Sequence, residues 1–289
     1  PSRLVRIMVG IPYFYRRLGY EYAIPTPGER IMDAPVNTAL RAGWTAATLE
    51  ADAVDDVQSA QQLMLNAADV AITHTTDKWR WLLSSPNYRV IRAMSKNETA
   101  YARIHQWDDA TYVFDIAATS DAGLAAIIAV AGQLANGDVT LQSRPALDHL
   151  LDHMGEQATQ DYAYYAQIND PIAMLEQLRP VLGRRLAAAP ASLPIAGEVV
   201  ISFYTSSVRF EYDAGTVGPM RPGPPIPAPG AAGGAGIPPD RFAELILGPR
   251  GFSAMARTHP DVLARTEAAT VMAVLFPPQR VDVQTWVYP

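Results

Sequence analysis

Cysteine is absent from the 289 residues, which excludes disulfides, thiol nucleophiles and zinc sites built on cysteine. Basic residues are few: 23 Lys and Arg stand against 29 Asp and Glu, and the net charge is -6. The sequence has no basic run to neutralise phosphates, so we expect no nucleic-acid partner. An acidic chain suits a cationic small molecule better.

Long apolar runs are also missing. No stretch approaches the roughly 20 residues needed to span a bilayer, and no signal peptide is visible, so we expect a cytoplasmic protein without a membrane span. Hydrophobic residues make up 49% and charged residues 18%, values typical of a folded globular chain. The length suffices for two or three domains. Because the first residue is Pro1 rather than Met, we expect a processed, cleaved or trimmed N-terminus.

The most informative stretch lies near the N-terminus and reads Ile-Pro-Tyr-Phe-Tyr-Arg-Arg-Leu-Gly-Tyr-Glu-Tyr over residues 11–22. It predicts a short helix that ends at Gly19, since glycine adopts the left-handed conformation without a Cβ clash. Between Tyr20 and Ile24 large side chains occupy every second position, which is the period of a strand. The stretch therefore predicts a helix that turns directly into a strand.

The pattern Tyr-x-x-x-Gly-Tyr resembles the segment near the end of a GNAT-type N-acetyltransferase domain. The fuller match resembles the multidomain bacterial branch that includes the enhanced-intracellular-survival acetyltransferases. The resemblance implies that the chain begins almost at the end of an acetyltransferase domain. It also implies that Tyr15 is the general acid and that the C-terminal carboxylate, here on Pro289 unless that end is trimmed, is the general base. The residue pattern alone favours a packing role for Tyr15.

The chain between residues 44 and 169 alternates helices and strands in a recognisable order. After a strand at 45–49, we predict helices at 55–68 and 76–83, strands at 88–94, 99–105 and 112–117, a helix at 121–134, a strand at 138–142, a helix at 146–154 and a strand at 162–168. Thr76 and Asp77 are the predicted caps of the second helix. This order resembles the GNAT order, so we predict the end of a first GNAT domain plus linker over 1–43 and a second GNAT-like domain over 44–169.

A sharp change at Asp170 and Pro171 begins the last part of the chain, because Asp caps a helix and Pro suits its first turn. We predict a long helix bent at Pro180, strands at 198–203 and 207–212, helices at 240–247 and within 260–274, and a strand at 280–288. Residues 215–239 are rich in Pro and Gly and predict a mobile or irregular loop with no apolar face. The order resembles a sterol-carrier-protein-like domain over 170–289. The predicted fold class is thus mixed α+β and α/β, a GNAT-like domain with a mixed sheet flanked by helices, followed by a sterol-carrier-protein-like α+β domain.

The glycine loop that binds acetyl-CoA in GNAT folds, R/Q-x-x-G-x-G/A, is missing. Its glycines let backbone amides face the pyrophosphate at a helix N-terminus. The equivalent junction at 117–123 has one glycine, and Asp121 puts a negative charge where the diphosphate would lie. The Gly-rich run at 230–236 lies in a proline-rich segment and is no substitute. We therefore predict that the second domain binds no cofactor, that acetyl-CoA is bound mainly upstream of this chain, and that this chain alone is inactive.

Other candidate residues have weaker support. His149 and His153 have the i, i+4 spacing of zinc ligands, but Leu150 stands where His-Glu-x-x-His has glutamate, so a solvated helix face is the favoured interpretation and we predict no metal. His74, His105 and His259 are isolated and predicted to be surface or capping groups. The tyrosines at 162, 164 and 165 predict core packing rather than a binding platform.

These observations lead to one favoured function and two alternatives. The favoured function is N-acetyl transfer from acetyl-CoA to a primary amine of a small molecule or peptide by a homo-oligomer, with Tyr15 protonating the leaving thiolate. The first alternative is a sterol-carrier-type module that binds a lipid or another apolar ligand without catalysis. The second is a scaffold that builds oligomer contacts.

Overall fold

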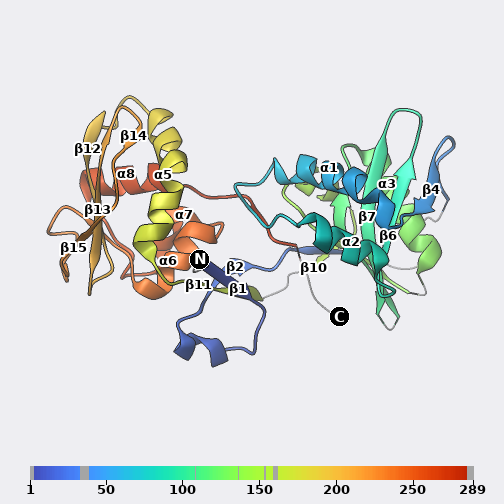
Figure 1. Ribbon diagram of the computed structural model, residues 1–289, viewed down its shortest axis with the longest axis horizontal. Coiled ribbons are helices and arrows are strands. Elements are labelled where there is room, and N and C mark those ends of the chain that lie inside the picture. Colours follow the sequence, from blue (N-terminus) through green and yellow to red (C-terminus); the bar gives the residue numbers. More distant parts are fainter. Residues whose placement is uncertain are drawn as a thin grey trace. The chain divides into compact units, whose positions relative to one another are not determined.

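The computed structural model describes residues 3–32, 39–107, 109–135, 137–152, 154–158 and 162–284. The chain forms two compact units, each assembled from segments distant in sequence (Figure 1). Unit 1 combines Pro1–Pro25 with Ala163–Gln279, and unit 2 combines Thr26–Tyr162 with Arg280–Pro289. These units divide the chain differently from the predicted boundaries after residues 43 and 169, because strands near both ends of the chain pair with distant partners.

Unit 2 contains most of the predicted helices and strands. Its elements are β3 (Glu29–Met32), β4 (Thr45–Thr48), η2 (Ala51–Ala53), α1 (Val54–Leu65), β5 (Val70–Ala71), α2 (Thr76–Ser84), β6 (Arg89–Met94), β7 (Thr99–Trp107), β8 (Ala110–Ala117), α3 (Asp121–Leu134), β9 (Val139–Gln142), α4 (Asp148–Leu151), β10 (Glu156–Ala158) and β17 (Val281–Asp282). The predicted helix at 146–154 is reduced to α4, because a turn in which Leu147 N–H donates to the Arg144 carbonyl precedes it.

The main sheet of unit 2 has seven strands in the order β10-β3-β9-β8-β7-β6-β4. All neighbours are antiparallel except β8 and β9, which makes the sheet mixed as predicted. The parallel pairing joins residues 111–113 to 139–141 and does not continue along β8. The sheet is therefore open between β8 and β9 beyond Val113.

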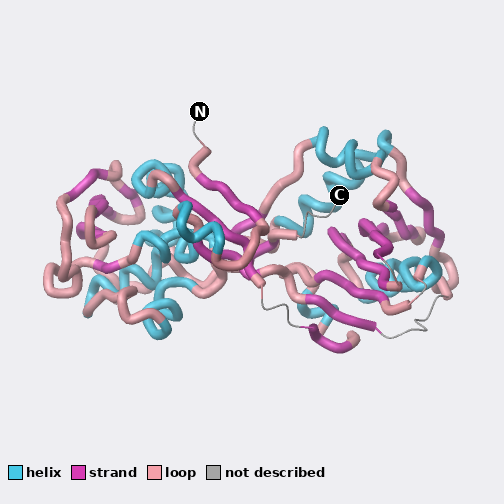
Figure 2. Tube along the Cα trace, turned by 90° about the horizontal axis from the view of Figure 1, so that it is seen from below, coloured by secondary structure: helices cyan, strands magenta, loops and turns pink. Residues whose placement is uncertain are grey.

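Helices cover both faces of this sheet. Residues 100–104 of β7 are all buried, which requires packing on each side of the strand. α1 packs on β7 and β8, α2 on β6, and α3 on β6, β7 and β8, so that helices flank the strands in Figure 2. Thr75 Oγ1 accepts the Lys78 N–H at 3.2 Å, so Thr75 caps α2 in place of the predicted Thr76 and Asp77, which lie inside the helix.

Unit 1 contains two sheets and four α-helices among its described residues. Its elements are β1 (Val5–Met8), η1 (Phe14–Leu18), β2 (Glu21–Pro25), β11 (Ala163–Ile168), α5 (Pro171–Ala187), β12 (Ala196–Ser202), β13 (Ser207–Asp213), β14 (Thr216–Val217), β15 (Arg221–Gly223), β16 (Ala235–Gly236), α6 (Pro239–Leu247), α7 (Gly251–Thr258) and α8 (Thr266–Leu275). β11 lies between β1 and β2 and is antiparallel to both. The second sheet has the order β14-β13-β12-β16, with β15 also paired to β13.

The start of α5 confirms the predicted helix cap. Asp170 Oδ1 accepts the Ala173 N–H at 2.9 Å, and Pro171 occupies the first helical position, where its missing N–H costs nothing.

The predicted irregular loop at 215–239 is wrong in one respect, because the segment does bury apolar side chains. Val217, Met220, Ala235 and Ile237 are all buried. β15 pairs with β13 over three residues, and β16 pairs with β12. Parts of the segment therefore belong to the second sheet of unit 1. The predicted strand at 280–288 is β17 over two residues, and its last four residues lie outside the described range.

No helix among the described residues has both the length and the apolar character that a membrane span requires.

Candidate functional site

Tyr15 is the second residue of η1, in a turn whose backbone is held at both ends. Tyr13 before η1 and Gly19 after it have left-handed φ angles of 67° and 81°. The Gly19 N–H donates to the Arg16 carbonyl at 3.0 Å, and β2 begins two residues later. The structure confirms the predicted helix that ends at glycine and turns into a strand.

The ring of Tyr15 is half-buried among aromatic neighbours. Its centroid is 5.7 Å from that of Tyr165 and 6.3 Å from that of Tyr20. A Cβ atom on Gly10 would collide with the Tyr15 ring, so glycine at this position lets the backbone approach the ring. Within the described residues the Tyr15 hydroxyl makes no hydrogen bond, so its proton is available to an external acceptor.

Tyr165 on β11 fixes the loop that leads to Tyr15. Its hydroxyl accepts the Tyr13 N–H at 2.6 Å and donates to the Ile11 carbonyl at 3.4 Å. Its ring is fully buried and stacks on Tyr22, with centroids 4.2 Å apart. Tyr164 and Tyr165 are therefore core residues, as predicted, and the sequence did not reveal that Tyr165 supports the Tyr15 loop.

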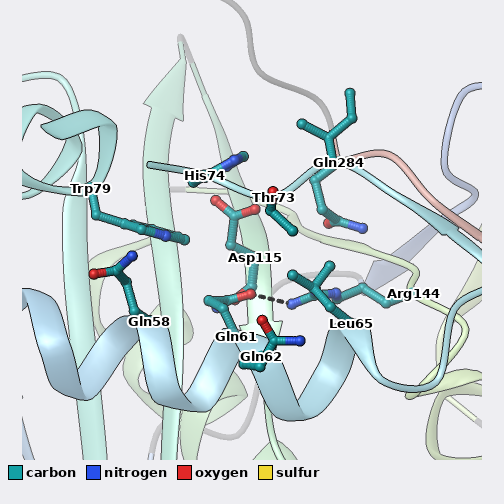
Figure 3. Close-up of a pocket in the computed structure, with 11 residues that line it drawn as sticks. Gln58, Gln61, Gln62, Leu65, Thr73, His74, Trp79, Asp115, Arg144 and Gln284 are labelled. Carbon is teal, nitrogen blue, oxygen red and sulfur yellow. Dashed lines mark hydrogen bonds between the residues drawn. The ribbon is translucent and has the colours of Figure 1, made fainter. Parts of the chain in front are cut away.

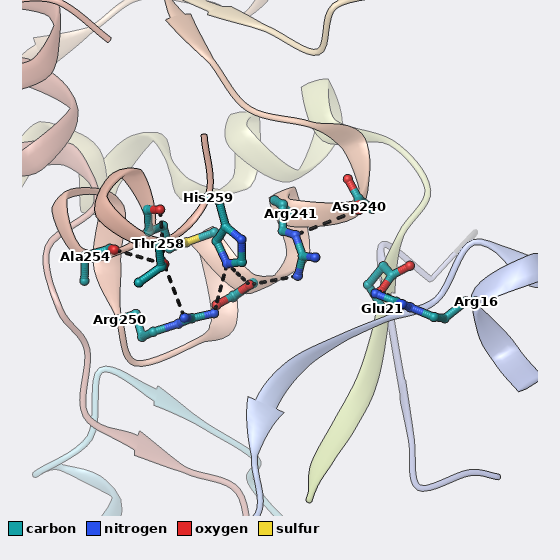
Figure 4. Close-up of polar contacts among 10 residues, drawn as sticks. Arg16, Glu21, Asp240, Arg241, Arg250, Ala254, Thr258 and His259 are labelled. Carbon is teal, nitrogen blue, oxygen red and sulfur yellow. Dashed lines mark hydrogen bonds and ion pairs between the residues drawn. The ribbon is translucent and has the colours of Figure 1, made fainter. Parts of the chain in front are cut away.

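Glu244 of α6 is a buried carboxylate that contacts polar side chains elsewhere in unit 1. Figure 4 shows three of them, Arg241, Arg250 and His259, near one another. Arg250 bonds one oxygen of Glu244, while Arg241 and His259 lie 3.5 Å and 3.9 Å from the other. His259 was predicted to be an isolated surface or capping group; it is the C-cap of α7 but is not isolated. Because this cluster joins α6 to α7, its first role is structural.

Arg16, next to Tyr15, pairs with Glu21 at 2.7 Å. The hydrogen bond to Glu21 and the attraction of Glu21 and Asp240 raise the pKa of Arg16. This pair joins η1 to the strand that follows it.

The junction between β8 and α3 carries the predicted charge pattern and a further carboxylate. Ser120 Oγ accepts the Gly123 N–H at 3.1 Å and caps α3, and it donates to Glu98 Oε1 at 2.6 Å. A Cβ atom added to Gly123 would lie 2.7 Å from the same Glu98 oxygen. Glu98 and Asp121 thus place two carboxylates at the N-terminus of α3, where positive potential favours an anion.

A polar cavity of about 90 Å³ lies in unit 2 between α1 and the open end of β8 (Figure 3). Its wall is formed by Gln58, Gln61, Gln62, Leu65, Ile72, Thr73, His74, Trp79, Asp115, Arg144 and Gln284. Gln61 links two parts of it, donating to the Asp115 carbonyl at 2.6 Å and accepting from Arg144 at 2.5 Å.

The charges around the cavity are balanced in pairs. Arg103 bonds Asp115 at 2.6 Å, and Arg144 bonds Asp282 at 2.8 Å. Burial alone raises the pKa of Asp115, but Arg103, His74 and Arg144 together bring that pKa below its usual value. Burial lowers the pKa of His74 from 6.5 to about 4, so His74 stays neutral in mild acid. It lies in the cavity wall and is not the isolated surface or capping group that was predicted.

The remaining predicted site residues are not brought together. His149 is exposed on α4, while His153 and the proposed base Pro289 lie outside the described residues. His105 bonds the Asn87 carbonyl through Nδ1 at 2.7 Å. In the described residues no three His, Asp or Glu side chains are arranged to hold a metal ion.

Comparison with known proteins gives structural matches only. No protein-family model and no curated protein sequence matches the chain. A GCN5-related N-acetyltransferase from Kribbella flavida superposes on 97% of this chain and 70% of its own, with 15% identity and a TM-score of 0.65. A GCN5-related N-acetyltransferase from Anabaena variabilis superposes on 96% of this chain and 72% of its own, with 12% identity and a TM-score of 0.64.

The chain has the fold of the GCN5-related N-acetyltransferases. Eis1 from Mycobacterium abscessus also matches, over 96% of this chain and 72% of its own, with 18% identity and a TM-score of 0.52. The predicted mixed sheet flanked by helices is thereby identified as part of a GNAT fold. The chain spans about seven tenths of the length of each neighbour.

Proposed function

We propose that this chain is part of an N-acetyltransferase that moves an acetyl group from acetyl-CoA to a primary amine of a small molecule or peptide. The GNAT fold over nearly the whole chain supports the reaction class. The observation that supports the assignment within the chain is Tyr15, whose ring lies against Gly10 and Tyr165 and whose hydroxyl makes no hydrogen bond to another described residue.

The nitrogen must lose two protons in this reaction, and the sulfur must gain one. A base takes the first proton from the ammonium, and the free amine attacks the thioester carbonyl of acetyl-CoA. The carbon–sulfur bond then breaks, and the thiolate leaves. Tyr15 gives its phenolic proton to that sulfur, and its phenolate takes the second proton from the nitrogen, so that the amine becomes an amide. Pro289 remains the proposed source of the base.

We further infer that unit 2 does not bind acetyl-CoA. Glu98 and Asp121 put negative charge at the N-terminus of α3, where a diphosphate would be repelled. Acetyl-CoA would then be bound by residues that precede Pro1 in a longer protein, and the chain alone would be inactive. Calorimetry of this chain with acetyl-CoA tests the inference: no binding at micromolar concentrations is expected, and micromolar affinity would refute it.

The function is tested with the full-length protein, acetyl-CoA and a set of primary amines. Thiol release should depend on the amine, and mass spectrometry should find the acetylated amine in matching amount. The matched tertiary amines, which cannot form a stable amide, serve as controls and should release no thiol. If thiol appears at the same rate without an amine, or none appears with any primary amine, the proposal is wrong.

The second candidate function is binding of an apolar ligand by residues 170–289, which we propose to be sterol-carrier-protein-like. The place to test it is a cavity of about 290 Å³ beside α8, whose wall combines Val199, Tyr212, Val271 and Met272 with the charged residues Glu198, Arg265 and Glu267. A fluorescent fatty acid should bind the wild type, and Met272→Trp, which fills the cavity, should weaken that binding. Equal binding by the two proteins would rule out this cavity as the site.

A further inference from the structure

Residues 280–284 return to unit 2 as a short extended segment. Val281 lies opposite Val70, and Asp282 lies opposite Ala71, in a parallel pair of two residues each. The Asp69 N–H donates to the Arg280 carbonyl at 2.8 Å, and the Ile72 N–H donates to the Asp282 carbonyl at 3.3 Å. Such a short ladder is too small to be stable alone, so side chains must hold the segment in place.

The side chains that hold it form a fully buried ion pair. Arg144 donates to Asp282 Oδ2 from Nε at 3.0 Å and from Nη2 at 2.8 Å, and the two side chains are 1% and 0% exposed. The other nitrogen of Arg144 donates to Gln61 Oε1 and to the Ile116 carbonyl at 2.9 Å. Gln284 donates to the second oxygen of Asp282 at 2.6 Å. Removing one partner of such a pair is costly because the other charge stays buried.

The same residues line the polar cavity. Arg144 and Gln284 form part of its wall, and Figure 3 draws them with Asp115 and His74. The ion pair between Arg280 and Asp69 is 3.6 Å long with side chains 62% and 39% exposed, so it contributes little. Buried Val283 and the hydrogen bond from Gln284 to the Ser143 carbonyl at 3.5 Å also hold the segment. Arg144 and Asp282 form its fully buried ion pair, and Gln284, which lines the cavity, bonds to that pair.

We propose that residues 280–284 are a strap over the cavity and that Arg144 and Asp282 are its latch. When the latch opens, Asp282 enters water, Arg144 keeps Gln61 and Ile116 as acceptors, and the wall formed by Gln284 is lost. Solutes then reach His74 and Asp115. This inference is independent of the acetyl-transfer proposal, because every readout below measures access and none measures catalysis.

Asp282→Asn is the direct test, with Asp115→Asn as the matched control. Each variant removes one charge from a buried Arg–Asp pair of unit 2 without changing side-chain size, but only Asp282 belongs to the strap. In Asp282→Asn the amides of Asp69 and Ile72 should exchange hydrogen roughly 100-fold faster, because the buried Arg144 loses its counter-ion. In Asp115→Asn the exchange of these two amides should not accelerate more than that of other amides. Equal selective acceleration in both variants, or none in Asp282→Asn, would overturn the proposal.

A second measurement reads the cavity itself. Diethyl pyrocarbonate modifies neutral imidazoles, so His74 should react faster in Asp282→Asn while the exposed His149 reacts at an unchanged rate. Mass spectrometry of the peptides separates the two histidines. An unchanged His74 rate would contradict closure of the cavity by the strap.

A disulfide lock keeps the test valid even if Asp282→Asn does not fold. The chain has no cysteine, so Val70→Cys with Val281→Cys creates one defined pair. Neighbouring strands lie about 4.8 Å apart, a distance that disulfides span. In the otherwise unchanged chain, oxidation should slow His74 modification, and reduction should restore it. If the rate is the same in both redox states, strap opening does not control access to His74.

Discussion

Mild acid should destabilise the protein through His74. The imidazole is held against Trp79, with ring centroids 4.9 Å apart, in the wall of the polar cavity. Burial, opposed by Asp115 and assisted by Arg103, lowers its pKa from 6.5 to about 4. In the unfolded chain the same imidazole takes up a proton near pH 6.5.

The sign and the size of the effect follow from these two pKa values. Because the folded pKa is the lower one, the unfolded state binds more protons between pH 6.5 and pH 4. The stabilisation by neutral His74 is therefore complete above pH 6.5 and is lost as the pH falls toward 4. For one such group, the free energy of unfolding should fall by about 2 kcal/mol between pH 7 and pH 5.

Urea denaturation of the wild type and of His74→Gln at pH 7 and pH 5 measures this loss. The variant removes the titrating group, so other acid-sensitive groups cancel in the comparison. The wild type should lose about 2 kcal/mol more than His74→Gln over this interval. An equal loss in the two proteins would show that His74 titrates normally and that the cavity is open to water.

Two substitutions test local structure in unit 1. Glu244→Gln should lower the free energy of unfolding by about 2 kcal/mol in urea denaturation, since it weakens the charge-assisted contacts that the buried carboxylate receives from Arg250 and Arg241. Glu198→Gln, from the half-exposed pair with Arg209, should cost at most about 1 kcal/mol, and similar losses in the two variants would refute the special role of Glu244. Gly19→Ala should cost about 1–2 kcal/mol because its φ is 81°. Gly28→Ala should be near neutral, since its φ is not positive and an added Cβ would only make van der Waals contact with Ser143. A neutral Gly19→Ala would mean that the turn after η1 relaxes freely.

Local signals in the sequence were sufficient for most helices and strands. The glycine after the aromatic stretch predicted the end of η1, and Asp170 with Pro171 predicted the start of α5. The apolar run at 121–134 and the alternating strands around it gave α3, β7 and β8 nearly to the residue. Each of these features depends on neighbours within a few positions of one another, which a single sequence displays directly.

Features that depend on distant residues were not visible. β5 and β17 are two residues long and some 210 positions apart, so neither has a pattern of its own. A separation of 138 positions likewise hides the pairing of Arg144 with Asp282, because either residue alone has the pattern of an ordinary surface charge. Asp121 was predicted from its place at a helix start, but Glu98 reaches α3 from the turn before β7, which only the folded chain reveals.

Tyr15→Phe tests the proposed general-acid role of the Tyr15 hydroxyl most directly. The substitution keeps the ring that packs on Gly10 and Tyr165 and removes only the proton donor. Tyr20→Phe is the matched control, since Tyr20 is a buried neighbour in the same motif without an assigned catalytic role.

In the full-length protein, Tyr15→Phe should lower kcat for acetyl transfer by about 10²- to 10⁴-fold, with little change in the free energy of unfolding, while Tyr20→Phe keeps nearly full activity. A change in KM alone would mean that Tyr15 binds substrate without donating a proton. An unchanged kcat in Tyr15→Phe would contradict the assignment of Tyr15 as the general acid.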